Sequence, residues 1–277
     1  MELPSVERVV ADLAALQKLG SRAVANPQAA NASVAYVEAQ LRALGLRVWL
    51  EPLTITDQRD AAAPTLAVTL GARTTAFAPA KHFLTATGSA SGAVAGARVA
   101  VVASRDWADS LAGPAVALVV PPSALDPDTF CQRIEAALAS SRTAAVLLAA
   151  LPTAKGYPNP EAPSGRIRCP SPLTITVPVL SLGQEPSWLL LSAALANPSL
   201  TVSLSAKTAL EQITVYNILA ESSSGSSDSV VVFGSHLDCV RAGPGVNDDG
   251  SGAIATLELA RLLDSFEKSG HKSVQVV

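Results

Sequence analysis

The sequence predicts an α/β protein, in which a partial doubly wound sheet is interrupted by a second, β-rich domain. A continuous apolar run at Val230–Phe233 is typical of a strand buried on both faces, and a helical pattern follows it at Ser251–Phe266. Helical and strand patterns also fill the first 70 residues. The stretch between is rich in Ala, Val, Gly, Ser and Pro, which suggests a separate core. We therefore expect one domain from residues 1–72 and 207–277, interrupted by an insert at 73–206.

The N-terminal part is predicted to contain two helices followed by two strands. Apolar residues recur at helical spacing after Ser5, a favourable N-cap, and Gly20 ends that run. A second helix is expected at Ser33–Leu44. Alternation of large apolar with polar residues predicts strands at Arg47–Ile55 and Thr65–Leu70.

The insert and the C-terminal part are predicted from short apolar runs between turn residues. In the insert a helical pattern occupies Asp128–Ala139, and the runs lie at Val99–Ala103, Ala115–Val120, Ala144–Leu151 and Val177–Leu182. Beyond it, Ile213–Glu221 is expected to be a strand, and Ser273–Val277 to begin another. This βαβ order predicts a parallel sheet whose ligands bind at the carboxyl ends of its strands.

Composition excludes several classes of function. The chain has 277 residues, 49% of them hydrophobic, and a formal net charge of −3 without a basic run, so nucleic acid is not an expected partner. The longest apolar runs are far shorter than the ~20 residues that span a bilayer, so no membrane span is expected. The first residues lack an apolar signal core. Either the protein is cytosolic or an N-terminal extension is missing.

The cysteines and two of the histidines decide little. Cys131 and Cys169 could pair in an oxidising compartment, which would leave Cys239 free; three unpaired thiols are the open alternative. His82 lies in the insert among apolar residues and His271 between Gly and Lys, and neither is assigned a catalytic role.

A histidine and two aspartates form the candidate site. His236 follows the predicted strand Val230–Phe233, and Asp238, two residues later, points the same way in an extended chain. A Gly-Pro-Gly turn then brings Asp248 to the start of the next helix, where a carboxylate is favoured and can reach back to the strand edge. Imidazole with carboxylate oxygen suits zinc or, less selectively, manganese or cobalt.

Two other interpretations compete with a metal site. Gly243 and Gly245 are part of a dinucleotide-loop pattern, but its third glycine position holds Asp248, and carboxylates there would repel a pyrophosphate. In the other, Asp248 or Asp249 caps the helix and His236 is a polar loop residue. The ordered string as a whole favours a metal site. Asp249 taken alone is better suited to a helix cap than to a metal ligand.

The same string resembles the M28 family of zinc exopeptidases. The resemblance is carried by Asn217-Ile218-Leu219-Ala220-Glu221, Phe233-Gly234-Ser235-His236-Leu237-Asp238 and Gly243-Pro244-Gly245-Val246-Asn247-Asp248-Asp249-Gly250-Ser251-Gly252. The regions Cys131–Leu148 and Ile175–Leu182 resemble a protease-associated (PA) domain, which some members carry inserted into the catalytic fold.

The resemblance implies a zinc-exopeptidase fold that holds two Zn2+ ions and hydrolyses terminal residues from peptides. It implies that His236 ligates one zinc, that Asp248 bridges both, and that Asp238 orients the base side of the site without binding metal. It also implies a cis peptide bond between Asp248 and Asp249, and a secreted or vacuolar protein. Among exopeptidases, we expect an aminopeptidase.

The sequence departs from the family pattern in two respects. Cys239 stands where a serine is more usual. The general-base glutamate, the zinc-ligand glutamate beside it, a further aspartate and a second histidine ligand would follow Ser273–Val277 and are not in this sequence. The chain is therefore expected to be a truncated exopeptidase, inactive by itself. The alternative is a non-catalytic, PA-bearing binding or receptor-like module; an acyltransferase of the glutaminyl-cyclase type is disfavoured by the insert.

Overall fold

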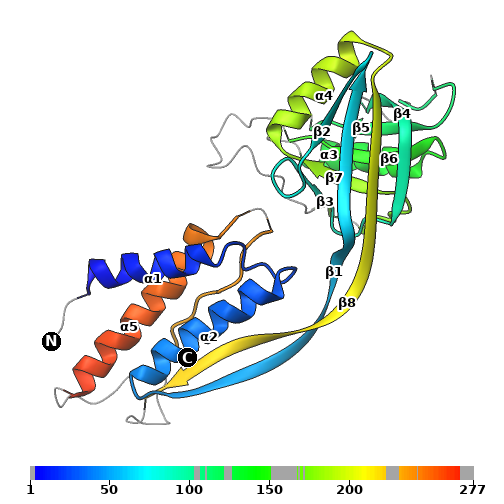
Figure 1. Ribbon diagram of the computed structural model, residues 1–277. Coiled ribbons are helices and arrows are strands. Elements are labelled where there is room, and N and C mark those ends of the chain that lie inside the picture. Colours follow the sequence, from blue (N-terminus) through cyan, green and yellow to red (C-terminus); the bar gives the residue numbers. More distant parts are fainter. Residues whose placement is uncertain are drawn as a thin grey trace. The chain divides into compact units, whose positions relative to one another are not determined.

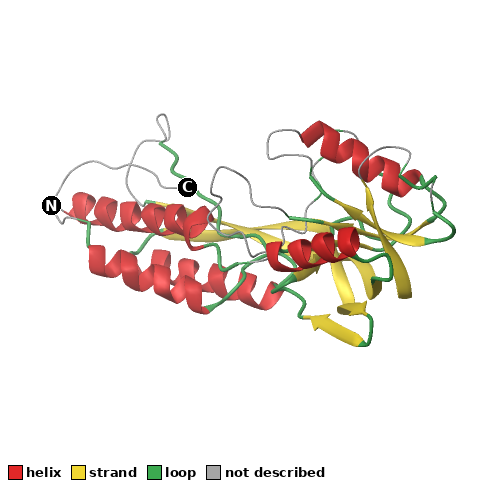
Figure 2. Cartoon of the chain, turned by 90° about the horizontal axis from the view of Figure 1, so that it is seen from above, coloured by secondary structure: helices red, strands yellow, loops and turns green. Residues whose placement is uncertain are grey.

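The computed structural model describes residues 4–102, 107–109, 111–121, 127–150, 167, 169–170, 172–222, 231–241 and 243–268. The chain divides into two compact units, which we call the terminal unit (Met1–Asp57 with Glu211–Val277) and the inserted unit (Gln58–Leu210). The sequence-based borders at 72/73 and 206/207 therefore lie inside the inserted unit. The α/β class is confirmed, and helices and strands occur in both units (Figures 1 and 2).

In the terminal unit three helices pack together, one long strand begins and another long strand ends. The helices are α1 (Val6–Lys18), α2 (Pro27–Ala43) and α5 (Ser251–Lys268); β1 (Arg47–Leu70) starts here and β8 (Thr201–Glu221) finishes here (Figure 1). Their shared core is built from Leu16, Leu41, Val48, Ala220, Ile254, Leu257 and Ala260. This core fixes the start of α5, which carries one side of the candidate site.

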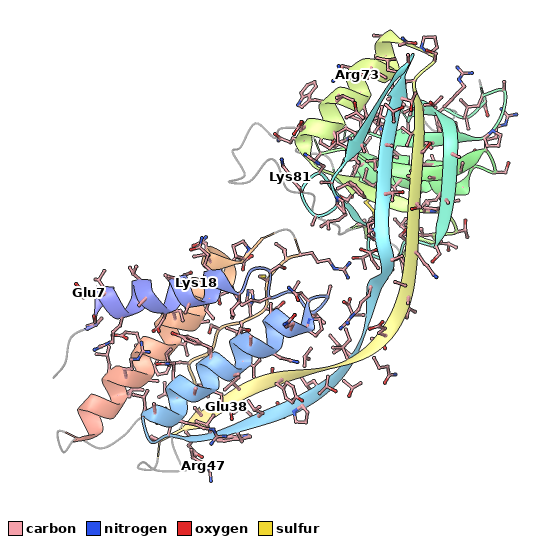
Figure 3. All side chains as sticks on the ribbon, in the orientation of Figure 1. Glu7, Lys18, Glu38, Arg47, Arg73 and Lys81 are labelled. Carbon is pink, nitrogen blue, oxygen red and sulfur yellow. A yellow bond between two sulfur atoms is a disulfide. The ribbon has the colours of Figure 1, made fainter. Side chains whose placement is uncertain are left out.

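The helix α1 begins where the sequence predicts. The hydroxyl of Ser5 accepts a hydrogen bond from the backbone N–H of Arg8 at 3.3 Å, which is an N-cap. Glu7 in the first turn and Lys18 in the last lie at opposite ends of the helix (Figure 3), as the helix dipole favours. The helix α2 starts at Pro27, six residues before the predicted start at Ser33, because proline is favourable in the first helical turn.

The two predicted strands at Arg47–Ile55 and Thr65–Leu70 form one continuous strand, β1. It neighbours β8, which begins at Thr201, twelve residues before the predicted strand Ile213–Glu221. Side-chain contacts join the two strands at Arg47–Glu221, Glu51–Asn217 and Thr65–Ser205. Because one residue number rises as the other falls, the strands run antiparallel.

The inserted unit is a mixed sheet with one helix on each face. It contains β2 (Arg73–Phe77), β3 (Phe83–Thr85), β4 (Gly92–Val102), β5 (Ala115–Val119), α3 (Pro127–Ala139), β6 (Thr143–Leu148), β7 (Val179–Leu182) and α4 (Gln184–Ala196). The strand order is β2-β1-β8-β4-β5-β6-β7-β3, with β4 to β7 parallel. Alternate residues of β5 point to opposite faces: Leu118 packs in the cluster that contains Leu190 of α4, and Val119 in the cluster that contains Ile134 of α3.

Cys131 and Cys169 form a disulfide in this unit, with their Cα atoms 5.6 Å apart, and Cys239 is a free, buried thiol. The structure thereby decides between the alternatives that the sequence left open. His82 accepts a hydrogen bond on Nδ1 from the backbone N–H of Ala78, and its ring packs edge-on against Phe77. It therefore plays a local structural part, while His271 lies outside the described residues.

The prediction of a doubly buried strand at Val230–Phe233 is wrong for the three residues that the structure describes. Residues 231–233 are not assigned to a strand, and Val231 and Val232 are 48% and 63% exposed. A strand needs a hydrogen-bonded neighbour on at least one edge, and no described strand pairs with these residues. The predicted strand Ser273–Val277 lies outside the described residues. No described helix combines the length and apolarity needed to cross a bilayer.

Candidate functional site

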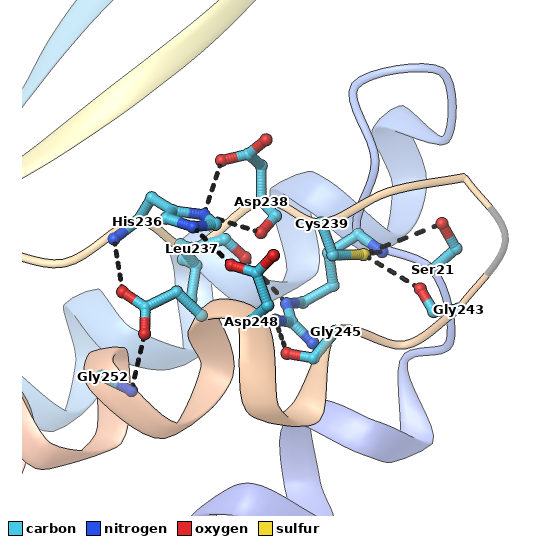
Figure 4. A network of polar contacts seen from close by, with 11 residues as sticks. Ser21, His236, Leu237, Asp238, Cys239, Gly243, Gly245, Asp248 and Gly252 are labelled. Atoms are coloured by element: carbon cyan, nitrogen blue, oxygen red, sulfur yellow. Dashed lines mark hydrogen bonds and ion pairs between the residues drawn. The ribbon is translucent and has the colours of Figure 1, made fainter. Parts of the chain in front are cut away.

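The structure brings His236, Asp238 and Asp248 together in the terminal unit. The imidazole lies between the two carboxylates: Nδ1 is 3.2 Å from Oδ1 of Asp238, and Nε2 is 3.1 Å from Oδ1 of Asp248 (Figure 4). The side chains are open to solvent, with 52%, 55% and 83% exposure respectively. Small solutes and ions can therefore reach all three.

The surroundings of the His236 ring determine where its proton lies. Nδ1 faces two acceptors, the carbonyl oxygen of Asp238 at 3.1 Å and the Asp238 carboxylate, so it carries the proton in the neutral ring. The lone pair of Nε2 then points at the Asp248 carboxylate. Partial burial lowers the pKa of His236, but the hydrogen bonds to Asp238 and Asp248 outweigh it, so the pKa lies above its ordinary value.

This arrangement favours a cation between Nε2 of His236 and the Asp248 carboxylate. In solution a second proton can fill that place. Two donor atoms bound to a tetrahedral zinc at about 2.1 Å lie about 3.4 Å apart. The observed 3.1 Å separation of Nε2 and Oδ1 is close to this value. Imidazole nitrogen with carboxylate oxygen is also a donor pair that zinc prefers, so these residues fit the ion.

Asp238 occupies the position of an orienting group for the imidazole. A histidine that binds a metal commonly donates its other ring N–H to a carboxylate, which fixes the tautomer and the orientation of the ring. Asp238 accepts from Nδ1 while Nε2 faces Asp248. Among the described residues, no three His, Cys, Asp or Glu side chains gather closely enough to hold a metal by themselves.

Asp249 links the segment of His236 to the start of α5. Its carboxylate accepts from the backbone N–H of His236 at 3.2 Å and from that of Gly252 at 3.0 Å, the second bond being a helix cap. The capping role considered for Asp249 is therefore confirmed, together with a second contact that spacing alone did not indicate.

The turn between His236 and Asp248 depends on a glycine. Gly245 has φ +59°, and a Cβ at this position would overlap Cβ of Cys239 and lie 2.9 Å from the carbonyl oxygen of Asp248. The short segment Val246–Gly250 follows, and within it Asp248 and Asp249 have non-helical backbone angles. The peptide bond between Asp248 and Asp249 is cis, as the family resemblance implies.

Sequence reasoning missed Arg22 completely. Its side chain is fully buried and donates hydrogen bonds to carbonyl oxygens of residues 237, 244 and 245, of which the first precedes the turn and the other two lie in it. An arginine just after a helix is expected on the surface, and nothing in its sequence neighbours signals these partners. The contacts span more than 200 residues of sequence, so only the fold reveals them.

An apolar cavity of about 420 Å3 adjoins the histidine within the terminal unit. His236 and Asp238 contribute to its lining, together with residues of α2, β8 and α5 such as Val37, Tyr216 and Leu257. Uncharged side chains form most of the lining. The candidate site thus has a charged part and an apolar part.

Comparison with known proteins adds sequence and fold relatives to this geometry. Residues 217–277 match the profile of Peptidase family M28. The chain is 38% identical over 77 residues to leucine aminopeptidase 2 of Arthroderma otae and 43% identical over 68 residues to probable leucine aminopeptidase 2 of Aspergillus fumigatus. These alignments cover 28% and 24% of this chain, and 16% and 14% of the relatives.

Solved structures match over nearly the whole chain. The Peptidase M28 precursor of Shewanella amazonensis has a TM-score of 0.68 at 18% identity, covering 99% of this chain and 63% of that one. The zinc aminopeptidase BSAP of Bacillus subtilis has a TM-score of 0.64 at 20% identity, covering 96% and 59%. At such identities the likeness shows the fold. The chain thus spans about a sixth of these curated relatives by sequence and about three fifths of these structures by fold. The family match thus covers the part of the chain that carries His236, Asp238 and Asp248.

Proposed function

We propose that this chain supplies part of the zinc centre of an exopeptidase that removes amino-terminal residues from peptides. In this proposal His236 ligates one zinc through Nε2, Asp248 bridges two zinc ions, and Asp238 orients the imidazole. The observation that carries it is the 3.1 Å approach of Nε2 of His236 to Oδ1 of Asp248, with the Asp238 carboxylate on the opposite ring nitrogen. The match of residues 217–277 to family M28 supports the same conclusion.

Each residue has a distinct task in this centre. Bound zinc would polarise the scissile carbonyl and lower the pKa of a bound water. Asp238 keeps the proton of the neutral ring on Nδ1, so that Nε2 offers its lone pair to the ion. Asp248 has two carboxylate oxygens and is 83% exposed, which leaves its second oxygen accessible to another ion. Asp249 holds the backbone of His236 against the start of α5.

The remaining zinc ligands and the general base are to be supplied from outside the described residues, in which no larger cluster of ligand side chains occurs. A two-ligand site binds zinc weakly, and without a base no water is activated. We therefore expect the chain alone to bind zinc measurably but not to hydrolyse a leucyl anilide. The names of the fungal relatives support leucine as the amino-terminal residue removed.

Zinc binding tests the proposal directly. The chain is titrated with Zn2+ while its three histidines are followed by NMR through their ring C–H signals. We expect the His236 signal to shift, with at least a tenfold weaker response in D248N. H82Q is the matched control, because His82 lies in the other unit, and it should bind as the wild type does. A His236 signal that ignores zinc, or an unchanged response in D248N, would refute the metal site.

Turnover is measured on the same samples. Hydrolysis of leucyl anilide that disappears in H236A would establish catalysis by this chain and contradict the expected need for further residues. Complete absence of zinc binding would instead favour the non-catalytic binding module. We also propose that the inserted unit is a PA domain. We further propose a secreted or vacuolar location, which the Cys131–Cys169 disulfide supports because disulfides persist in oxidising compartments.

A further inference from the structure

We propose that Arg22 is a positioning residue for the zinc centre, acting through the backbone on both His236 and Asp248. This inference rests on the proposed function and assigns a task to a residue that has no place in the ligand set. Arg22 touches none of the three site side chains in any contact described above. Its influence runs through the two chain segments that carry them.

The first argument is the burial of its charge. The Arg22 side chain is 0% exposed, although arginine is almost never fully buried unless its donors are satisfied. Removing a guanidinium from water is costly, and hydrogen bonds must offset that cost. Nε donates to the carbonyl of Leu237 at 2.8 Å, one terminal nitrogen donates to the carbonyl of Pro244, and the other donates to the carbonyl of Gly245 at 3.1 Å.

The second argument is the location of these carbonyls. The carbonyl of Leu237 belongs to the peptide that joins Leu237 to Asp238, so Arg22 holds the backbone directly after His236 and directly before Asp238, whose carboxylate contacts Nδ1 of His236. Gly245 lies three residues before Asp248, and its carbonyl also accepts a hydrogen bond from the backbone N–H of Gly250 at 3.0 Å. This places it at the base of the turn that carries Asp248. One rigid, planar group therefore bridges the histidine segment and the aspartate segment.

The third argument is that the backbone around Arg22 is held independently of its side chain. The N–H of Arg22 donates to Sγ of Cys239 at 3.0 Å, and that thiol donates to the carbonyl of Gly243 at 3.1 Å. The hydroxyl of Ser21 donates to the carbonyl of Val240 at 3.1 Å. Removal of the guanidinium leaves these bonds possible, so its own contribution can be measured.

Three variants test the proposal in the full chain: R22A, R22K and the control R42A. Arg42 is an exposed arginine of α2 that pairs with Glu38, and none of its described contacts reaches residues 236–249. Two quantities are measured under conditions where urea titration shows each variant to be folded. One is the zinc affinity from the His236 ring signal, and the other is the metal-free nuclear Overhauser effect between the His236 ring and the Asp248 Cβ protons.

We expect R22A to bind zinc about tenfold more weakly, or worse, and to lose the Overhauser effect, while R42A changes neither. Millimolar guanidinium should restore both in R22A, whereas urea, which has a similar shape and no charge, should not. A merely structural role would lower stability without altering these site readouts in the folded molecules. Unchanged affinity and an unchanged Overhauser effect in folded R22A would overturn the proposal.

If R22A does not fold, R22K decides the question. A lysine keeps the charge, but its single ammonium cannot span all three carbonyls, so the site contact should still weaken. Wild-type behaviour in R22K would overturn the role assigned to the guanidinium fork. A wild-type chain without any zinc response refutes the proposed function alone, because the metal-free Overhauser effect still decides whether Arg22 sets the approach of His236 to Asp248.

Discussion

Nε2 of His236 lies 3.1 Å from a carboxylate oxygen of Asp248, although the two residues are twelve positions apart and lie on different backbone segments. Their meeting requires the chain to reverse between them. Gly245 makes the reversal possible because its positive φ and its missing side chain allow the turn to pass close to Cys239. The geometry of the proposed metal site is therefore a property of this turn as much as of its ligands.

Replacement of Gly245 by alanine is predicted to damage the site. Its φ of +59° disfavours a side chain, and the new Cβ would overlap that of Cys239. We expect a loss of about 3 kcal/mol in the free energy of unfolding, from backbone strain and overpacking together. The His236–Asp248 contact should also be lost in the molecules that remain folded. Urea unfolding and the His236–Asp248 Overhauser effect measure the two consequences.

G45A is the matched control for that prediction. Gly45 lies in the same unit with φ +78°, and a Cβ there meets nothing within 4 Å. The G45A substitution should lower the free energy of unfolding by the backbone strain alone, about 1 kcal/mol, and leave the His236–Asp248 contact intact. Equal effects of G245A and G45A would show that packing against Cys239 is unimportant.

The stability of the terminal unit is predicted to fall in acid because of Glu258. Hydrogen bonding by Arg8 lowers the pKa of this buried carboxyl and outweighs the effect of burial; with further bonds from Ser5 and Arg261 the pKa reaches about 2, against an ordinary 4.5. Between these values the unfolded chain binds a proton that the folded chain does not. The stabilisation is thus complete above pH 4.5 and is lost as the pH falls towards 2.

The variant E258Q should lose this contribution. The glutamine lacks the negative charge that Arg8 and Arg261 share, although Arg261 keeps its ion pair with Asp12, so the free energy of unfolding at pH 7 should decrease by about 3 kcal/mol. Its dependence on pH between 2 and 4.5 should flatten. E38Q is the control, since Glu38 pairs with the half-exposed Arg42 and such pairs contribute about 0.5 kcal/mol. Urea unfolding across this pH range gives both results, and parallel pH curves for the wild type and E258Q would contradict the prediction.

The disulfide Cys131–Cys169 is predicted to stabilise the inserted unit. It closes a loop with a sequence separation of 38 residues. Cross-linking a loop of this length restricts the unfolded chain and is worth about 3–4 kcal/mol. Hydrogen exchange of amides in α3, which carries Cys131, should therefore be faster in the C131S/C169S double variant.

Reduction provides the control for that experiment. The wild type treated with a reductant should exchange like the double variant, while the double variant should not respond to the reductant. Identical exchange of the oxidised wild type and the double variant would show that the cross-link does not contribute to stability.

Local patterns in the sequence were sufficient where neighbouring residues decide the structure. The cap at Ser5 set the start of α1, and the apolar run Ala115–Val120 became β5, because capping and burial patterns act over a few residues. The spacing of His236 and Asp238 was likewise readable as a shared side of an extended segment. These interactions need no information from distant parts of the chain.

Prediction failed where distant partners decide. The apolar residues Val231 and Val232 suggested a buried strand, but no described strand pairs with them, and α4 at Gln184–Ala196 was not foreseen. The extended length of β8 was missed as well, since its first half is defined by pairing with β4. Strand formation depends on a neighbour that the strand's own residues do not specify.

The amino-acid sequence by itself determined the α/β class and the match of residues 217–277 to family M28, because periodicity and an ordered motif are local properties. Only the tertiary structure decided that Cys131 pairs with Cys169 and that the guanidinium of Arg22 joins the two segments of the site. The physical reason is that a buried charge or a cross-link is stable only where partners far away in sequence are brought within contact distance, and packing of the whole unit brings them there.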